Sequence, residues 1–458
     1  MNTKHIQHLY WRAGFGILPE QLKMFSKNSK AEIIDMLFYN SKTRTPLLID
    51  TSEFDSVNEM ELKKDKILKI KLIELSKERI KDFNYAWIER LINPKELLRE
   101  RMTLFWANHF VCGGNNILHM QKFNNTLRKH ALGDFRDFVK AISKEAAMIS
   151  YLNGNQNRKR KPNENFAREL MELFTLGIGN YSEGDVKQVA RAFTGYNFDY
   201  KGRFQLRQKQ HDYGRKTIFG KAGLFNGNNT IDIITNQQQC AQFICEKIYR
   251  YFVNDSVVPS HVKEMVSVFY PNYNIEELMR FVLNSYWFYD KKNIGVKIKS
   301  PIDLLVGIQK VVPITFKKKQ RLLYIQRLFG QVLLKPPNVA GWKVGKYWVD
   351  SNTMVSRLRL ASILMNEFRI PFNEKGGFTD KYRRQYFKNN ADKSVFKTEP
   401  NWKTFHKNFD AFSSVTLEAT LLLSPINNGT KAYLKTLNKS SKQDYCIQLM
   451  SLPEYQMC

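Results

Sequence analysis

The chain lacks the sequence patterns that identify the commonest catalytic and metal-binding proteins. It has no Gly-rich phosphate loop ending in Gly-Lys-Ser/Thr, no Gly-x-Gly-x-x-Gly after an expected strand and no Gly-x-Ser-x-Gly nucleophile motif. His5 and His8 lie close together, but no carboxylate or thiol stands near them. Nucleotide hydrolases, Rossmann enzymes and standard serine hydrolases are therefore not first choices, and we expect neither a metal nor another cofactor.

Long apolar runs and cysteines are also scarce. No stretch of about 18 or more apolar residues occurs, so we expect no membrane span. The start of the sequence shows no apolar core followed by a small-residue cleavage site, so it does not resemble a secretory signal. An odd number of cysteines at low density, without a usual zinc or redox spacing, indicates reduced structural thiols and favours a cytoplasmic location. The cysteines are Cys112, Cys240, Cys245, Cys446 and Cys458.

Charge of one sign is abundant. The 458 residues include 72 Lys and Arg against 43 Asp and Glu, a formal net charge of +29. Such a charge favours binding to polyanions such as an acidic glycan, nucleic acid or an anionic membrane face. The alternative is that lysines scattered along the chain serve solubility alone, and composition does not decide between the two.

Helical patterns dominate the chain and predict a mainly α fold, a large multi-helix single domain that spans residues 1–458. Residues 196–220 differ, because aromatic and β-branched residues flank Lys201-Gly202, and this pattern predicts a small β-hairpin element. Residues 371–412 are polar and weakly periodic, and they predict an insertion or irregular loop.

The stretch "PNENFARELMELFTLG", residues 162–177, predicts an amphipathic helix. Apolar residues at i, i+4 and i+8 form its expected buried side, which contains Phe166, Leu170 and Phe174. The opposite stripe is polar and is formed by Glu164, Asn165, Arg168, Glu169 and Glu172.

This polar stripe contains candidate catalytic residues. Glu169 and Glu172 are three positions apart, which places their Cβ atoms about 5–6 Å from each other on a helix. Two half-buried carboxylates this close shift each other's pKa, and Arg168 would keep one of them ionised. General acid–base catalysis needs such a difference, so Glu164, Arg168, Glu169 and Glu172 are candidates. A solvated helix face with ordinary i,i+4 ion pairs is the alternative.

Four basic residues directly precede this helix. The free N–H groups of a helix N-terminus favour anions, so a basic run there indicates a substrate-binding position. A solvated loop is the alternative. The candidate substrate-binding residues are Arg158, Lys159, Arg160, Lys161, Asn163 and Asn165.

Two further motifs are weaker. "HDYGRK" follows the expected hairpin, and its His211-Asp212 could form a His–carboxylate pair with catalytic value, while Lys216 adds a donor. "PPNVAGW" contributes Asn338 and Trp342 as candidate binding residues, since aromatic residues among lysines suit stacking on sugar rings or bases. No helix-turn-helix or RNP-type pattern occurs, so nucleic acid is a weakly supported partner.

Several of these motifs together resemble an uncharacterised bacterial family, domain of unknown function 1800. The resemblance rests on nine blocks, which occur in the order of the family and cover nearly the whole chain. They are "YWRAGFG", "FWANHF", "LRKHALGDFRDF", "PNENFARELMELFTLG", "YSEGDVKQVARAFTGY", "HDYGRKTIFG", "KSPIDLLVG", "PPNVAGW" and "SLPEYQ".

The resemblance implies little about chemistry, because the family has no established reaction. Its members are often encoded beside a family similar to sulfatases and alkaline phosphatases, which implies envelope glycan metabolism and a possible sulfatase-like partner protein. Many members carry export signals, so the resemblance implies an envelope or secreted location that the start of this sequence does not support. Within the family motifs, Glu183, Asp185 and Arg191 are expected to form a structural polar network.

Two hypotheses about function remain. In the first, the protein is an enzyme, a hydrolase or lyase, that acts on a glycan or other anionic polymer through a pocket shared by the carboxylates and the His-Asp turn. In the second, it is a non-catalytic scaffold that binds a polyanion or an acidic partner, and the glutamates and arginines are internal ion pairs. The position of the polar stripe in the folded chain discriminates between them.

Overall fold

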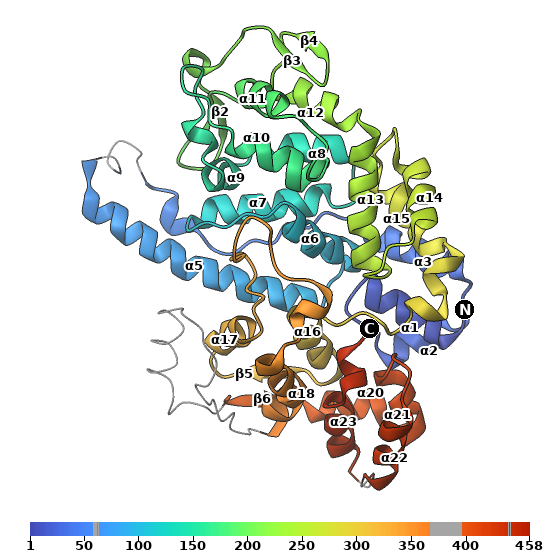
Figure 1. Ribbon diagram of the computed structural model, residues 1–458. Helices are drawn as coiled ribbons and strands as arrows, with labels where there is room; N and C mark the ends of the chain where they lie inside the picture. Colours follow the sequence, from blue (N-terminus) through green and yellow to red (C-terminus); the bar gives the residue numbers. More distant parts are fainter. Residues whose placement is uncertain (58–61, 63, 367–395, 438, 440) are drawn as a thin grey trace. The chain divides into compact units, whose positions relative to one another are not determined.

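The computed structural model describes residues 1–57, 62, 64–366, 396–437, 439 and 441–458 (Figure 1). Within these residues the protein is mainly α-helical, as predicted, and its strands pair only in two-stranded antiparallel sheets. No helix in the described part of the chain is both long enough and apolar enough to cross a membrane.

The chain divides into two compact units, each discontinuous in sequence. The terminal unit consists of Met1–Lys30, Tyr289–Val332 and Lys343–Cys458. The inserted unit consists of Ala31–Phe288 and Leu333–Trp342. One continuous domain over the whole chain stays a prediction from sequence pattern.

The inserted unit contains most of the helices and two hairpins. Its helical elements are α3 (Lys30–Asn40, whose first residue belongs to the terminal unit), η1 (Ser52–Phe54), α5 (Lys66–Ile92), α6 (Leu97–His109), α7 (Ile117–His130), α8 (Phe135–Ile142), α9 (Ala146–Tyr151), η2 (Gly154–Gln156), α10 (Asn165–Glu169), η3 (Leu170–Thr175), α11 (Glu183–Ala192), η4 (Gln208–Gln210), α12 (Gly227–Thr235), α13 (Gln238–Phe252), α14 (Pro259–Phe269) and α15 (Ile275–Asn284). Its strands are β1 (Tyr196–Phe198), β2 (Phe204–Leu206), β3 (Lys216–Ile218) and β4 (Lys221–Gly223). The short helix η5 (Tyr286–Tyr289) lies at the boundary between the units.

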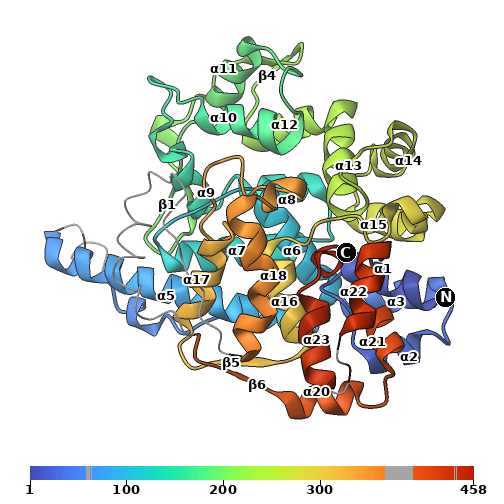
Figure 2. The same ribbon diagram turned by 60° about the horizontal axis from the view of Figure 1, so that its bottom comes forward.

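The terminal unit is also helical, and in it α18 packs against α23 (Figure 2). Its elements are α1 (Thr3–Arg12), α2 (Pro19–Phe25), η6 (Lys291–Asn293), α16 (Pro301–Val311), β5 (Ile314–Phe316), α17 (Gln320–Leu328), η7 (Gly345–Trp348), α18 (Ser351–Asn366), β6 (Thr398–Pro400), α20 (Trp402–Phe409), α21 (Ser414–Leu421), α22 (Asn428–Thr436), α23 (Lys442–Met450) and η9 (Pro453–Gln456).

Local sequence explains where many helices begin. Polar side chains cap the first turns, as when the Asp65 carboxylate accepts a hydrogen bond from the Leu68 N–H at 2.9 Å. Proline begins α14 and α16, where its missing N–H leaves no intrahelical bond unmade.

The inserted unit has an aromatic core around α6. Trp106 is fully buried and its ring lies 5.7 Å from that of Phe110 and 5.3 Å from that of Phe138, measured between centroids. The Trp106 indole N–H donates to the Ala131 carbonyl at 3.0 Å, so its one polar group is satisfied. The motif "FWANHF" therefore supplies core residues.

The predicted β element near residues 196–220 is confirmed and consists of two hairpins. Strands β1 and β2 pair around Gly202, whose φ of +75° suits glycine at the turn. Strands β3 and β4 pair next to α11. A further pair, β5 with β6, joins Phe316 to Thr398, a contact between distant segments that local sequence patterns do not reveal.

The predicted irregular segment lies partly outside the described residues. Residues 371–395 belong to that part, while residues 396–412 contain strand β6 and helix α20. The described end of this segment is therefore regular structure. Asn401 caps α20 by accepting a hydrogen bond from the Thr404 N–H at 2.9 Å.

Candidate functional site

The acidic helix is α-helical only in its first turn. Residues Asn165–Glu169 form α10, and residues Leu170–Thr175 continue as a π-helix. The Leu176 N–H donates to the Met171 carbonyl at 2.8 Å, five residues back. Single π-turns of this kind occur often at functional sites. The predicted buried side is nevertheless confirmed, since Phe166, Leu170 and Phe174 are at most 6% exposed.

The end of this π-helix is held by Lys247, which sequence reasoning did not single out, and by His109 of the motif "FWANHF". Lys247 donates to the Leu173 carbonyl at 2.8 Å, and His109 donates through Nε2 to the Phe174 carbonyl at 3.0 Å. Burial lowers the pKa of Lys247 to about 8 and lowers that of His109 well below its usual value. The available sequence signals were a lysine on α13 next to its buried apolar stripe and a histidine within "FWANHF".

The four basic residues before the helix form an exposed, closed turn. The Lys161 N–H donates to the Arg158 carbonyl at 2.9 Å, and the Lys159 N–H donates to the Gln210 carbonyl at 2.9 Å. The second bond ties the turn to the segment that carries exposed Arg207. We call the combined set the basic surface; its members are Arg158, Lys159, Arg160, Lys161, Arg207 and Lys209. Among the described residues no carboxylate forms an ion pair with any of these six side chains, all of which are exposed.

A buried asparagine joins this turn to the neighbouring helices. Asn157 is 2% exposed. Its Nδ2 donates to the Ala190 carbonyl at 2.8 Å, and its Oδ1 accepts from the Asn163 N–H at 2.9 Å. The Asn157 carbonyl also accepts from the Gly195 N–H at 2.9 Å. Asn157 therefore fixes the start of the acidic helix against α11, a role that no sequence motif indicated.

The two predicted binding asparagines take part in local structure. The Asn163 side chain accepts from the Asn165 N–H at 3.0 Å, and Asn165 Nδ2 donates to the Leu152 carbonyl at 3.2 Å. These bonds shape the chain as it enters α10. Asn165 remains exposed and Asn163 is half-buried.

Arg168 pairs mainly with α11. Its guanidinium donates two hydrogen bonds to Glu183, both at 2.8 Å, and a longer one of 3.4 Å to Glu164. The i,i+4 pair with Glu164 was predicted, whereas the fork to Glu183 comes from tertiary packing. Glu183 is 67% exposed, so this pair contributes little to stability.

Glu169 and Glu172 occupy two different environments on the same helix. Burial, together with the charge of Glu172, raises the pKa of the Glu169 carboxyl, and Arg168 opposes this effect. Glu172 accepts a hydrogen bond from the Tyr181 hydroxyl at 2.7 Å. Burial and this bond raise the pKa of Tyr181 to about 12. The environment of Glu169 therefore favours its protonated form, while the neighbouring Glu172 accepts a hydrogen bond from a phenol.

Further titratable groups near Glu169 are also affected by burial. Glu169 and Cys112 both act electrostatically on Tyr151, whose pKa is raised mainly by burial. Glu145 is 6% exposed, accepts a hydrogen bond from the Thr126 hydroxyl at 2.7 Å, and has its pKa raised by burial. The sequence offered no signal for Glu145, because its burial depends on how α7 packs against α9.

The His-Asp turn does not form a His–carboxylate pair, which corrects the prediction. His211 is 4% exposed, and its Nδ1 donates to the Thr194 carbonyl at 2.7 Å. Asp212 instead accepts two hydrogen bonds from Arg191, at 2.7 and 3.3 Å. Arg191 lowers the pKa of Asp212 below its usual value, and the Gly214 N–H, which donates to the same carboxylate, acts in the same direction.

The two polar groups lie near opposite ends of α11. Glu183, the partner of Arg168, begins this helix, and Arg191, the partner of Asp212, lies eight residues further along it. At 1.5 Å per residue the two anchors are about 12 Å apart along the axis. Within the described residues no hydrogen bond or ion pair joins the glutamates of the acidic helix to His211 or Asp212. These contacts therefore do not support a pocket shared by the glutamates of the acidic helix and the His211-Asp212 turn.

Two further candidate binding residues are buried. Lys216 is 1% exposed and donates to the carbonyls of Asp212 and Gly214 at 2.6 and 2.9 Å. Trp342 is 4% exposed and its backbone N–H donates to the Asn108 side chain at 2.7 Å. Burial keeps the lysine from contacting a bound polymer and the indole from stacking on a sugar ring.

Asn338 is exposed and separate from these groups. Its Oδ1 accepts from the Ala340 N–H at 2.9 Å, which stabilises the loop before Trp342.

The expected structural polar network is present as bonds around α11. Ser182 and Asp185 form the capping box that begins this helix. The second oxygen of Asp185 accepts from the Phe219 N–H at 2.8 Å and so attaches the β3–β4 turn. Glu183 and Arg191 make the ion pairs described above, so α11 connects the whole region. In the part of the chain that the structure describes, no group of three or more His, Cys, Asp or Glu residues could hold a metal ion.

The chain thus has a mainly α fold in two units and carries these motifs in order. The chain belongs to the family described as protein of unknown function (DUF1800), which matches it over residues 8–457. No curated protein and no solved structure matches it.

Proposed function

We propose that the protein is an enzyme that acts on an anionic glycan. Glu169 and Glu172 are its acid–base pair, and the basic surface binds the glycan. The observation that carries this proposal is the unequal environment of the two carboxyls, which lie three residues apart on one helix.

The chemistry follows from that inequality. A general acid must hold its proton near neutral pH, and the raised pKa of Glu169 moves it in that direction. Glu172, with a hydrogen bond from Tyr181, suits the partner that accepts a proton. Hydrolysis and β-elimination of a glycosidic bond both use such a division of roles. His211 and Asp212 are not part of this proposed pair.

Substrate binding follows from charge. The six exposed cations of the basic surface have no acidic partners in the described part of the chain, so they attract carboxylate or sulfate groups along a glycan. Lys161 precedes Glu169 by only eight residues, so a glycan bound at the basic surface would pass close to the acid–base pair.

Non-catalytic binding of the same glycan is the second candidate. Arg168 and Arg191 are both held in ion pairs, as expected for scaffolding. In that case the basic surface alone would carry the function.

The two candidates are separated by measuring binding and turnover together. Purified protein is mixed with uronate-containing or sulfated polysaccharides, and both the binding constant at two salt concentrations and the release of new chain ends are followed. We expect Glu169→Gln to abolish release and leave binding unchanged. Alanine at Arg158, Lys159, Arg160 and Lys161 should weaken binding and lower the slope of log K against log salt by about one per lost contact.

A matched control removes four exposed lysines of the terminal unit at the same cost in net charge: Lys403, Lys407, Lys431 and Lys435. Binding should survive in this control. Equal loss in both variants would show that binding depends on diffuse charge. Release by Glu169→Gln at the wild-type rate would exclude the acid–base role and leave the binding proposal standing.

A further inference from the structure

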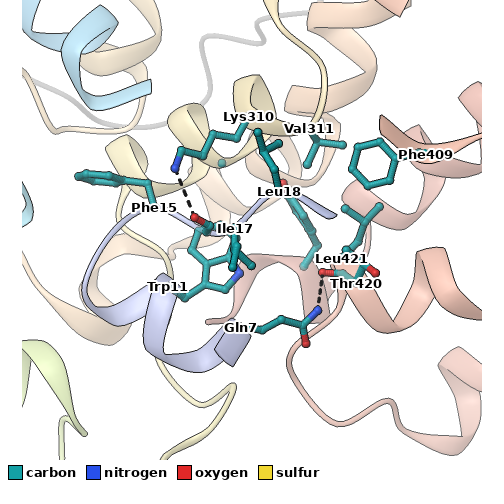
Figure 3. Close-up of a pocket in the computed structure, with 13 residues that line it drawn as sticks. Gln7, Trp11, Phe15, Ile17, Leu18, Lys310, Val311, Phe409, Thr420 and Leu421 are labelled. Carbon is teal, nitrogen blue, oxygen red and sulfur yellow. Dashed lines mark hydrogen bonds between the residues drawn. The ribbon is translucent and has the colours of Figure 1, made fainter. Parts of the chain in front are cut away.

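A partly enclosed pocket in the terminal unit brings together three motifs that the proposed function does not use. Trp11 and Phe15 come from "YWRAGFG", Gly307 comes from "KSPIDLLVG" and Tyr455 comes from "SLPEYQ". Figure 3 shows Trp11, Phe15 and Lys310 around this space. A Cβ at Gly307 would lie 2.6 Å from the Trp11 ring, so glycine is needed for the indole to form this wall.

Lys310 is the only charged residue among those that line the pocket. Its ammonium donates one long hydrogen bond of 3.3 Å, to the Gly16 carbonyl (Figure 3). An ammonium has three donors, so two remain without a partner among the described residues. Burial lowers the pKa of Lys310 to about 8, and most molecules therefore carry this positive charge at neutral pH.

A second lysine lies behind the pocket wall. The Lys299 ammonium lies 3.9 Å from the centroid of the Trp11 ring and 3.7 Å from that of Tyr455. Both residues also line the pocket. Burial lowers the pKa of Lys299 to about 7 and Asp303 acts on it in the opposite direction, so Lys310 supplies the main positive charge at the pocket.

Tyr455, a further lining residue, has an unpartnered donor. This residue is 1% exposed, and its hydroxyl has no hydrogen-bond partner among the described residues. A buried hydroxyl without a partner is costly, so a ligand that accepts from it would remove that cost. The remaining wall is mostly apolar and includes Phe15 and Leu18.

We propose that this pocket binds a small monocarboxylate about the size of acetate. Its carboxylate would accept hydrogen bonds from Lys310 Nζ and the Tyr455 hydroxyl, and its methyl end would contact the apolar wall. The site is distinct from the basic surface and stands independently of the proposed glycan chemistry.

Size and charge both select this ligand. The centres of water-sized molecules can occupy about 30 Å³ of the pocket, which is room for about two or three waters because each needs about 10–15 Å³. One lining cation balances a single negative charge. Phosphate, with two charges and four oxygens, would want more donors than one lysine and one tyrosine supply.

The proposal is tested with acetate as the probe, by saturation-transfer NMR on the full chain. We expect transfer to the acetate methyl group in the wild type. Lys310→Met should weaken acetate binding by about tenfold or more, and Tyr455→Phe by about two- to tenfold, as expected for a charge-assisted and a neutral hydrogen bond. Lys318→Met, which removes an exposed lysine of the same unit, should bind like the wild type.

Two measurements on the wild type keep the test decisive if a variant fails to fold. Acetate binding should fall as the pH rises above about 8, because Lys310 then loses its proton. Phosphate at equal concentration and ionic strength should displace little acetate. Equal binding by the Lys310→Met and Lys318→Met variants, binding that is constant from pH 7 to pH 10, or ready displacement by phosphate would each overturn the proposal.

Discussion

At the scale of single residues, the acidic helix shows how far sequence reasoning reaches. The spacing of Glu169 and Glu172 predicted their proximity, and the buried stripe around Leu170 was confirmed. The bidentate partner of Arg168 and the donor to Glu172 were not predictable, since Glu183 and Tyr181 approach only through tertiary packing. Covalent spacing fixes neighbours within a helix, but it does not fix which side chain arrives from another element.

Glu169 gives a testable dependence of stability on pH. Its folded-state pKa is raised, so its ionised form costs stability that is absent at low pH and grows as the pH rises through that pKa. Glu169→Gln removes this cost. We expect the variant to have a larger free energy of unfolding in urea than the wild type at pH 7, and no advantage near pH 4.

Glu172→Gln serves as the control, because it weakens the hydrogen bond from Tyr181 while it also removes the charge that repels Glu169. This variant should gain less than Glu169→Gln at pH 7. A Glu169→Gln advantage of the same size at pH 4 and pH 7 would contradict the raised pKa.

At the scale of elements, helix starts and the hairpin region were predicted from local sequence. The π-turn and the β5–β6 pair were not. The capping box at Ser182 was visible because its two partners are three residues apart. The π-turn at Leu170–Thr175 was not, because it depends on Lys247 and His109 holding carbonyls at its end. The β5–β6 pair also escaped, because its strands are distant in sequence.

Helix α11 is the element that connects the candidate site, so its N-cap is expected to matter beyond its own turn. Ser182→Ala removes the acceptor for the Asp185 N–H and should cost about 1 kcal/mol of unfolding free energy, within a range of about 0.5–2 kcal/mol. The measurement is chemical unfolding followed by far-UV circular dichroism.

Ser150→Ala is the matched control, because Ser150 is an exposed serine inside α9 rather than at a cap. It should change stability by less than about 0.5 kcal/mol. A loss in Ser182→Ala no larger than in this control would show that the capping box contributes nothing measurable.

At the scale of the whole molecule, helical patterns predicted the mainly α class, but the division into units was not predictable. The terminal unit is assembled from three segments, and its core joins Trp11 to Ile294, Leu423 and Cys458. Patterns read along a chain identify elements, but they carry no information about which distant elements share a core.

The two units should respond separately to core mutations. Trp11→Ala opens the terminal core and Phe174→Ala the inserted one, and each should cost about 3–5 kcal/mol. By differential scanning calorimetry we expect two transitions, with each variant lowering a different one. Both variants shifting one shared transition would show that the units unfold as a single cooperative block.

The discontinuity of the terminal unit has a consequence for synthesis in the cell. Residues 1–30 emerge from the ribosome before the other segments of their unit, which begin only at Tyr289. At about 5–20 residues per second the leading segment waits about 13 to 52 seconds for them. During that delay the Trp11 indole and the Phe15 ring, which are buried in the folded protein, remain exposed to solvent. We expect a chaperone that binds nascent chains to bind this segment.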